Sequence, residues 1–234
     1  MHDGAIRKFT GQDSQQQSVR FDGLESESEY RWELTKGPTQ TLTRSGHFTI
    51  FSTDGSRSFA VVGHTHGTEH LGHYPDQVLA SSIASSRPQF LIHTGDCVYL
   101  STHKGWKKAF FQIFRPVLEH SPIYIAPGNH DSGWPFIDGM DLRTFQELFP
   151  HPYPEDILGT PGAANYDKVQ GSINFLYISY VTDLAKGTPQ YDWIKNTLRS
   201  STSEFNIVVL GGANNYFAKQ DLETLLNGDG SRGA

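Results

Sequence analysis

Apolar and polar positions follow two different patterns along the chain. Up to about residue 55, the apolar residues fall in short runs of β character, and Asp22-Gly23 and Lys36-Gly37-Pro38 supply turn residues between them. The expected strands cover residues 18–21, 30–34 and 47–51. Three strands do not close a sandwich, so we expect residues 1–55 to be a partial β-rich segment, the end of a small β-domain.

From residue 56 onward, apolar runs typical of buried strands alternate with amphipathic stretches, which is the pattern of an α/β domain. In the first expected helix, Val78, Leu79 and Ile83 predict a face that packs on the core. The expected strands are 58–63, 89–93, 122–126, 174–180 and 206–210, and the expected helices are 75–86, 106–118, 141–149 and 190–198.

Polar side chains with the chemistry of metal ligands directly follow three of these strands. The three loops are Gly63-His64-Thr65-His66-Gly67, Gly95-Asp96-Cys97-Val98-Tyr99 and Gly128-Asn129-His130-Asp131. Because ligands gather beyond the carboxyl ends of strands in open α/β sheets, we expect the three loops to converge on one site. Imidazole, carboxylate and amide oxygen together suit Zn, Mn or Fe ions. Each motif is weak alone, but their joint order predicts a metal site.

Composition and charge narrow the classes of function. The net charge is −6, with 19 Lys and Arg against 25 Asp and Glu, which argues against a dedicated nucleic-acid binder. Cys97 is the only cysteine, so neither an intrachain disulfide nor a multi-cysteine metal site is expected. No apolar run approaches the ~20 residues of a membrane span, and the first residues lack an apolar signal region.

Two of the three loops carry a resemblance to a known family. Gly95-Asp96 and Gly128-Asn129-His130-Asp131, with the spacing between them, resemble the calcineurin-like metallophosphoesterases. The Asp96-x-x-Tyr99 spacing and residues 188–194 resemble the purple acid phosphatase branch of that family. The resemblance implies an α/β fold: a metallophosphoesterase-type β-sandwich flanked by helices (α/β/β/α), C-terminally incomplete. It also implies that residues 1–55 end a fibronectin-III-like β-domain and that residues 56–234 form the phosphoesterase domain.

The resemblance implies roles for individual residues as well. The implied metal ligands are His64, His66, Asp96, Tyr99 and Asn129, with Asp96 bridging two ions. His130 is the implied general acid or transition-state stabiliser, and Asp131 is expected to orient it. Tyr99 is either an iron ligand or a packing residue, and both interpretations stay open.

The implied reaction is hydrolysis of a phosphorylated small molecule or another phosphoester. In such a reaction a pair of divalent or mixed-valence ions (Fe, Mn or Zn) activates a metal-bound water and clamps the phosphoryl oxygens. The resemblance also allows an extracytoplasmic location, which the sequence itself leaves undetermined.

Three positions depart from the family pattern, and all concern metal ligands. Residue 64 is His where the family has Asp, which removes one negative charge from the site. The strand at 206–210 leads into Gly211-Gly212-Ala213-Asn214-Asn215 where the family has a histidine ligand. No histidine follows His151, so the family's last motif is absent. The count of ligands therefore favours at most one well-held metal ion and an impaired hydrolase.

Two other functions compete with the hydrolase. The first is a non-catalytic relative that binds a metal ion or a phosphate-bearing partner, and the missing imidazoles after residue 210 favour it. The second is an amidohydrolase-type zinc enzyme, which would explain the His-x-His pair at His64 and His66. That fold needs a barrel of about 250 residues, and it leaves Gly128-Asn129-His130-Asp131 unexplained.

Several conspicuous residues have structural interpretations instead. His93 lies inside an expected strand and is predicted to be a hydrogen-bonded core histidine, and Cys97 is predicted to be buried. His70 and His73 are expected in a solvated loop, while Trp134 fits either a pocket wall or the core.

Overall fold

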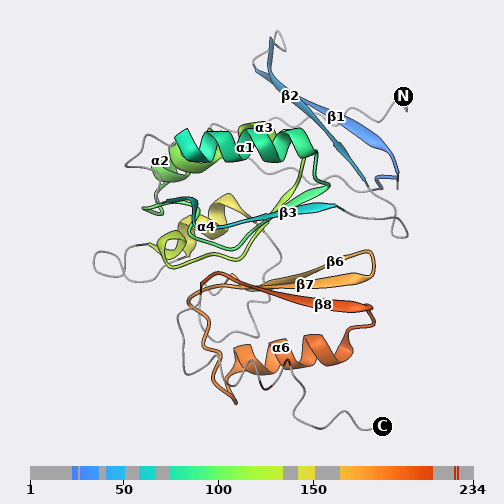
Figure 1. Ribbon diagram of the computed structural model, residues 1–234, viewed down its shortest axis with the longest axis vertical. Coiled ribbons are helices and arrows are strands. Elements are labelled where there is room, and N and C mark those ends of the chain that lie inside the picture. Colours follow the sequence, from blue (N-terminus) through green and yellow to red (C-terminus); the bar gives the residue numbers. More distant parts are fainter. Residues whose placement is uncertain are drawn as a thin grey trace.

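Helices and sheets stack in layers in the computed structural model (Figure 1). The structure describes residues 23–25, 27–36, 41–50, 58–66, 74–133, 142–150, 164–212, 224 and 226. The expected strand at 18–21 and the expectations for His70, His73, Trp134, Asn214 and Asn215 lie outside the described residues.

A β-hairpin projects from the layers at the top of Figure 1, and it is joined to them by the His47 N–H, which donates to the Glu119 carbonyl. Its strands β1 (Glu29–Lys36) and β2 (Thr41–Thr49) pair antiparallel and place Tyr30 opposite Phe48, whose rings stack at 5.7 Å. The strand expected at 30–34 is confirmed as β1, and β2 begins six residues before the strand that was expected at 47–51. The assignment of residues 1–55 to a fibronectin-III-like domain stays a prediction.

Two three-stranded sheets form the centre of the fold. The first sheet has the order β3-β4-β5 and is parallel throughout, with β3 (Phe59–Val62), β4 (Phe90–His93) and β5 (Ile123–Ile125). The second has the order β6-β7-β8, with β6 (Tyr166–Gln170), β7 (Ile173–Ile178) and β8 (Phe205–Leu210). Strand β7 pairs antiparallel with β6 and parallel with β8. All expected strands from residue 58 on are confirmed, and β6 is an additional one.

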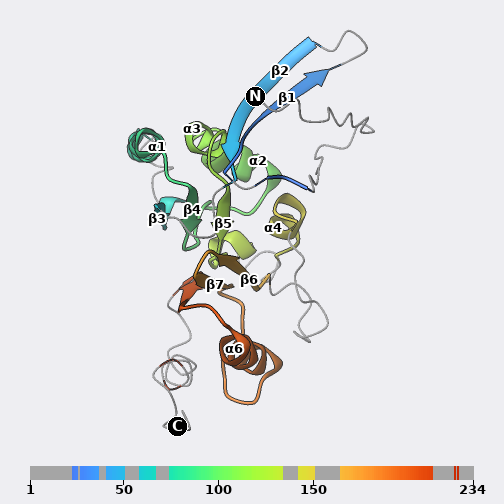
Figure 2. The same cartoon turned by 90° about the vertical axis from the view of Figure 1, so that its right-hand side faces the viewer.

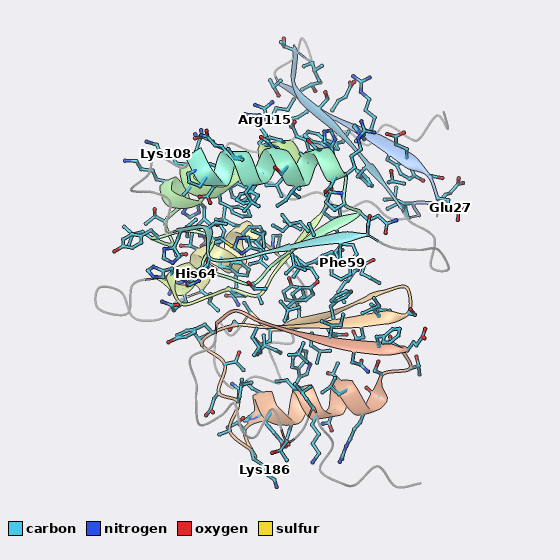
Figure 3. All side chains as sticks on the ribbon, in the orientation of Figure 1. Glu27, Phe59, His64, Lys108, Arg115 and Lys186 are labelled. Carbon is cyan, nitrogen blue, oxygen red and sulfur yellow. The ribbon has the colours of Figure 1, made fainter. Side chains whose placement is uncertain are left out.

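The two sheets pack face to face around aromatic residues. Phe59 lies between them, stacked on Phe90 and edge-on to Phe175 (Figure 3). The Tyr166 hydroxyl of β6 donates to the Ile125 carbonyl and accepts from its N–H, which joins the second sheet to β5. This sandwich confirms the predicted fold. The two sheets are separate, so the barrel that an amidohydrolase-type enzyme requires is not what the described strands form.

Helices cover the outer face of each sheet (Figures 1 and 2). The first sheet carries α1 (Tyr74–Ser86), α2 (His103–Gly105), the π-helix η2 (Trp106–Phe111), α3 (Arg115–Leu118) and α4 (Arg143–Leu148). The second carries α6 (Pro189–Ser200). These helices complete the α/β/β/α arrangement. None of the helices in the described part has both the length and the hydropathy needed to cross a membrane.

Two helix predictions need correction. The single helix expected at 106–118 is divided into η2 and α3, because Pro116 has no N–H to continue a helix from the preceding turn. In α1, Val78 and Leu79 are exposed, whereas Ile83 faces the core as expected, together with Ala80. The apolar residues of this helix are too unevenly spaced for periodicity to give its buried face.

Candidate metal centre

The loops after β3 and β4 lie side by side and are joined by their backbones. The N–H of His64 donates to the Gly95 carbonyl at 3.0 Å, and the N–H of His66 donates to the Asp96 carbonyl at 3.2 Å. Because the strands are parallel, both loops leave the sheet at the same edge. The expected convergence of the first two loops is thereby confirmed.

Three glycines bring the ends of β4, β5 and β8 into backbone contact. A Cβ added to Gly95 would lie 2.6 Å from the Gly128 nitrogen and 2.7 Å from the Gly211 oxygen. A Cβ on Gly128 would lie 2.6 Å from the Asp96 nitrogen and 2.8 Å from the Gly211 oxygen. Both sheets therefore contribute to the site. The close contact of Gly211 with the other two loops was not predicted, although Gly211 directly follows a strand, as the residues of those loops do.

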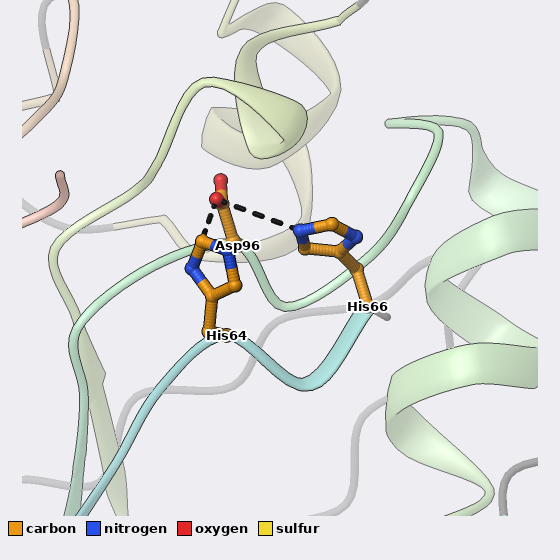
Figure 4. A group of neighbouring side chains, drawn as sticks. All are labelled: His64, His66 and Asp96. Carbon is orange, nitrogen blue, oxygen red and sulfur yellow. Dashed lines mark ion pairs between the residues drawn. The ribbon is translucent and has the colours of Figure 1, made fainter. Parts of the chain in front are cut away.

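His64, His66 and Asp96 form a group that fits one metal ion (Figure 4). Asp96 Oδ2 lies 3.2 Å from His64 Nδ1 and 3.6 Å from His66 Nε2, and one ligand atom from each residue falls within 4.8 Å of the others. With bond lengths of about 2.0–2.2 Å, two ligand atoms on one ion lie roughly 3–3.5 Å apart. The two contacts of Asp96 are close to this spacing, and the donor types suit a divalent transition-metal ion.

The three candidate ligands differ in burial, and two of them have an unusual backbone conformation. The side chain of Asp96 is 6% exposed, that of His66 12% and that of His64 77%. His64 and Asp96 have φ values of +61° and +55°, in the left-handed region that few residue types other than glycine adopt, Asp and His among them. A buried carboxylate is costly unless a cation or hydrogen bonds compensate it. The site therefore suits a cation at Asp96, reached from solvent on the His64 side.

His130 and Tyr99 border this group. The rings of His66 and His130 stack at 4.1 Å, and the Tyr99 ring lies 5.2 Å from His130 and 5.9 Å from His66. The His130 backbone N–H donates to Asp96 Oδ1 at 3.1 Å, while its Nδ1–H donates to the Tyr99 carbonyl at 2.9 Å. Since a carbonyl only accepts, Nδ1 carries a proton and Nε2 is the nitrogen that can exchange one. These contacts leave both interpretations of Tyr99 open, as an iron ligand or as a packing residue.

Asp131 has a different role from the one expected. It was predicted to orient His130, but its Oδ1 accepts from the Cys97 N–H at 2.9 Å and the Val98 N–H at 3.4 Å, and its Oδ2 accepts from the Gly128 N–H at 2.9 Å. The Tyr99 carbonyl is what holds the His130 ring. Asp131 therefore ties the loops after β4 and β5 together. Motifs give a residue type, and they do not reveal which backbone amides a buried carboxylate meets.

Asn129 is half-buried and directly precedes η3 (His130–Ser132). Its carbonyl accepts from the Ser132 N–H and hydroxyl, so the backbone of this turn is fixed next to Asp96. Its role as a ligand stays a prediction. Cys97 and His93 are both buried, as predicted.

Two buried groups of the site have opposite pKa shifts. Burial raises the pKa of Asp131 from 3.8 to about 7, although three backbone N–H groups favour its charged form. Burial lowers the pKa of His93 from 6.5 to about 3, and the nearby His64 lowers it further. Near pH 5 the folded chain holds a proton on Asp131 and none on His93, whereas the unfolded chain does the reverse.

These shifts predict opposite pH slopes of stability in two single variants. Between about pH 4 and 6.5, the contributions of Asp131 and His93 cancel, because folding moves one proton without changing their number. In His93→Gln only the raised Asp131 remains, so stability should fall as pH rises through this window. In Asp131→Asn only the lowered His93 remains, so stability should rise with pH. Each slope should be about 1 kcal/mol per pH unit relative to the unsubstituted chain.

Urea unfolding of chelator-treated protein at several pH values between 4 and 6.5 measures both slopes. The same sign of slope in both variants would contradict the assignment of protons to these two side chains.

Comparison with known proteins agrees with this geometry. Over residues 57–231, the chain matches the family described as calcineurin-like phosphoesterase. It is 26% identical over 153 residues to the protein named "Probable inactive purple acid phosphatase 9" of Arabidopsis thaliana, covering 56% of this chain and 24% of the relative. It is also similar in structure to purple acid phosphatase PPD1 from yellow lupin (Lupinus luteus) seeds, with a TM-score of 0.64 and 19% identity.

The alignment with the lupin structure covers 79% of this chain and 36% of the lupin chain. The chain thus spans about a quarter of the curated relative and about a third of the solved one. Since the family match covers most of the chain, including all three loops, this protein belongs to the calcineurin-like phosphoesterase family and is similar to its purple acid phosphatase-like members.

Proposed function

We propose that this chain is a metal-dependent phosphoester hydrolase of reduced activity that holds one divalent ion on His64, His66 and Asp96. The observation that carries the proposal is the arrangement of these three ligands around one point, next to the His130 ring. Zn²⁺, Mn²⁺ and Fe²⁺ are the ions that two imidazoles and one carboxylate suit. The division into a β-rich segment at residues 1–55 and a phosphoesterase domain at residues 56–234 belongs to the same proposal.

The charges of the site favour a phosphoester as its ligand. Two neutral imidazoles and one carboxylate leave a net positive charge on a divalent ion, which attracts phosphate oxygens. When bound, such an ion acts as a Lewis acid on a phosphoryl group and as a source of hydroxide near neutral pH. The substrate class is therefore a phosphoester with an accessible phosphoryl group.

His130 is suited to protonate the leaving group. Its Nδ1–H is held by the Tyr99 carbonyl, which fixes the ring and leaves Nε2 as the nitrogen that delivers a proton. A positioned histidine contributes about 10²–10⁴-fold to such a step. Asp131 supports this arrangement indirectly, because it fixes the loop that carries His130 through the Gly128 N–H.

The reduction in activity follows from the second metal site. Its proposed ligands are Asp96 and Asn129, whereas Tyr99, if it acts as a ligand, belongs to the first site. Strand β8 reaches the site as Gly211, which offers no side-chain ligand. With few ligands, a second ion should bind weakly and support two-metal hydrolysis poorly. The word "inactive" in the name of the Arabidopsis relative agrees with this proposal.

A non-catalytic role is the second candidate, favoured by the glycine that stands at the end of β8. Hydrolysis of an aryl phosphate with added Mn²⁺ separates the two functions. Turnover that Asp96→Asn abolishes supports the hydrolase. Metal-dependent binding of inorganic phosphate without turnover supports the non-catalytic candidate. The absence of both turnover and phosphate binding would contradict both functions.

Replacing His64 with aspartate should raise the affinity for Mn²⁺ about tenfold. The substitution restores a negative charge at a position whose φ of +61° suits aspartate, and a harder ion gains most from an oxygen ligand. His64→Asn is the matched control, because it tolerates the same backbone but adds no charge. Calorimetric titration with Mn²⁺ measures the three affinities. An aspartate variant no tighter than the unsubstituted chain would show that residue 64 does not limit metal binding.

A further inference from the structure

We infer that a buried hydrogen-bond network of Thr65, His93 and Cys97 positions the metal ligands, with Thr65 and His93 as positioning residues. This inference rests on the proposed metal site. Thr65 stands between His64 and His66, and Cys97 directly follows Asp96. The three network residues are all buried.

The network joins the two ligand-bearing loops through the His93 ring. His93 Nε2 lies 3.3 Å from Thr65 Oγ1, and its Nδ1 lies 3.2 Å from both the Gly95 nitrogen and the Cys97 sulfur. The Thr65 hydroxyl also donates to the Cys97 carbonyl at 3.3 Å. Each loop is thus tied to the ring, and the loops are tied to each other.

One arrangement of protons satisfies all four of these hydrogen bonds. Because the Thr65 hydroxyl donates to the Cys97 carbonyl, it must accept from His93 Nε2–H. The other ring nitrogen, Nδ1, then accepts from the Gly95 N–H and from the Cys97 thiol. His93 is therefore the neutral Nε2–H tautomer, and both loops depend on that tautomer.

Because the network is buried, the loss of one of its hydrogen bonds is costly and affects the loops that carry the ligands. The rings of Phe110 and Phe114 face His93 edge-on at 5.8 and 6.2 Å, on the side of the helix layer. Loss of the Thr65 hydroxyl would leave His93 Nε2–H and the Cys97 carbonyl without that bond in a dry environment. The loop between His64 and His66 would shift to relieve this, and metal sites tolerate ligand displacements of only about 0.5 Å.

The test compares Thr65→Ser, which keeps the hydroxyl, with Thr65→Val, which keeps the shape. Calorimetric titration of each chain with Zn²⁺ should give a serine variant within about threefold of the unsubstituted chain and a valine variant at least tenfold weaker. Equal affinity of the valine variant, or equal loss in both variants, would overturn the inference. The second result would show that any change of this side chain weakens binding, so that the hydroxyl has no special role.

A second measurement separates positioning from general stability. Thermal unfolding with and without Zn²⁺ should show a smaller metal-induced rise of the midpoint in Thr65→Val, whereas a merely structural role would lower both midpoints equally. If Thr65→Val does not fold, Thr65→Ala takes its place, since the space left can admit a water. Failure of the unsubstituted chain to bind Zn²⁺ would contradict the proposed function. Binding that is insensitive to residue 65 would contradict this inference alone.

A double-mutant cycle tests whether the residues act as one unit. His93→Phe should weaken Zn²⁺ binding as Thr65→Val does, and the double variant should be little weaker than either single one. Fully additive losses would overturn the claim that the hydroxyl acts through the ring.

Discussion

Replacing Asp96 with asparagine should lower the affinity for Zn²⁺ by about 100-fold or more, with the fold retained. Asp96 is the ligand shared by both imidazoles, and its charge is the only one in the group. Changes to residues that only hydrogen-bond to metal ligands already cost about 10–100-fold in affinity, so loss of the charged ligand should cost at least as much. Asparagine keeps an oxygen that can accept from the His130 N–H, so the loop after β5 stays in place.

Asp167→Asn is the matched control, because Asp167 is exposed on β6 in the other sheet. It removes the same charge at a distance from the site and should leave Zn²⁺ affinity within about twofold. Calorimetric titration of both variants gives the comparison, and circular dichroism checks the fold. Similar losses in both variants would point to net charge and would contradict a specific role for Asp96.

Replacing Gly128 with alanine should destabilise the protein by about 3 kcal/mol and remove metal binding with it. The added Cβ would come within 2.6 Å of the Asp96 nitrogen and 2.8 Å of the Gly211 oxygen, and it would also strike Asp96 Oδ1. Two of these atoms belong to the backbone of neighbouring loops, which cannot turn aside as a flexible side chain does. The clash therefore moves the ligand loop.

Gly187→Ala provides the comparison for this variant. Gly187 has no atom within 4 Å of an added Cβ, but its φ is +91°, so alanine there should cost about 1 kcal/mol through conformation alone. Urea unfolding measures both changes in free energy. An equal cost at the two positions would contradict the close approach of three strand ends at Gly128.

The sequence predicted the architecture because its apolar runs are short and clearly separated. Strands β3, β4 and β5 each consist almost wholly of apolar residues, so their positions were evident without the structure. Strand β6 was missed because Asp167 and Lys168 are exposed on it, and an edge strand with charges lacks that pattern. The division of the helix at 106–118 follows from Pro116, whose missing N–H the apolar periodicity does not report.

The site was predictable in its residue types and less so in its contacts. His64, His66 and Asp96 come together because parallel strands end at one edge, which is a rule of topology. The contacts of Asp131 with backbone amides, and the hold of the Tyr99 carbonyl on His130, depend on the paths of two loops. Those paths are fixed by close glycine contacts across both sheets, and sequence spacing does not contain them.

The number of metal ions per chain tests the central claim most directly. Protein loaded with Zn²⁺ or Mn²⁺ and desalted should contain close to one ion per chain by elemental analysis, and Asp96→Asn should contain almost none. A content near zero in the unsubstituted chain would contradict the three-ligand site. A content near two would contradict the single-ion account and would mean that Asn129 and further ligands hold a second ion.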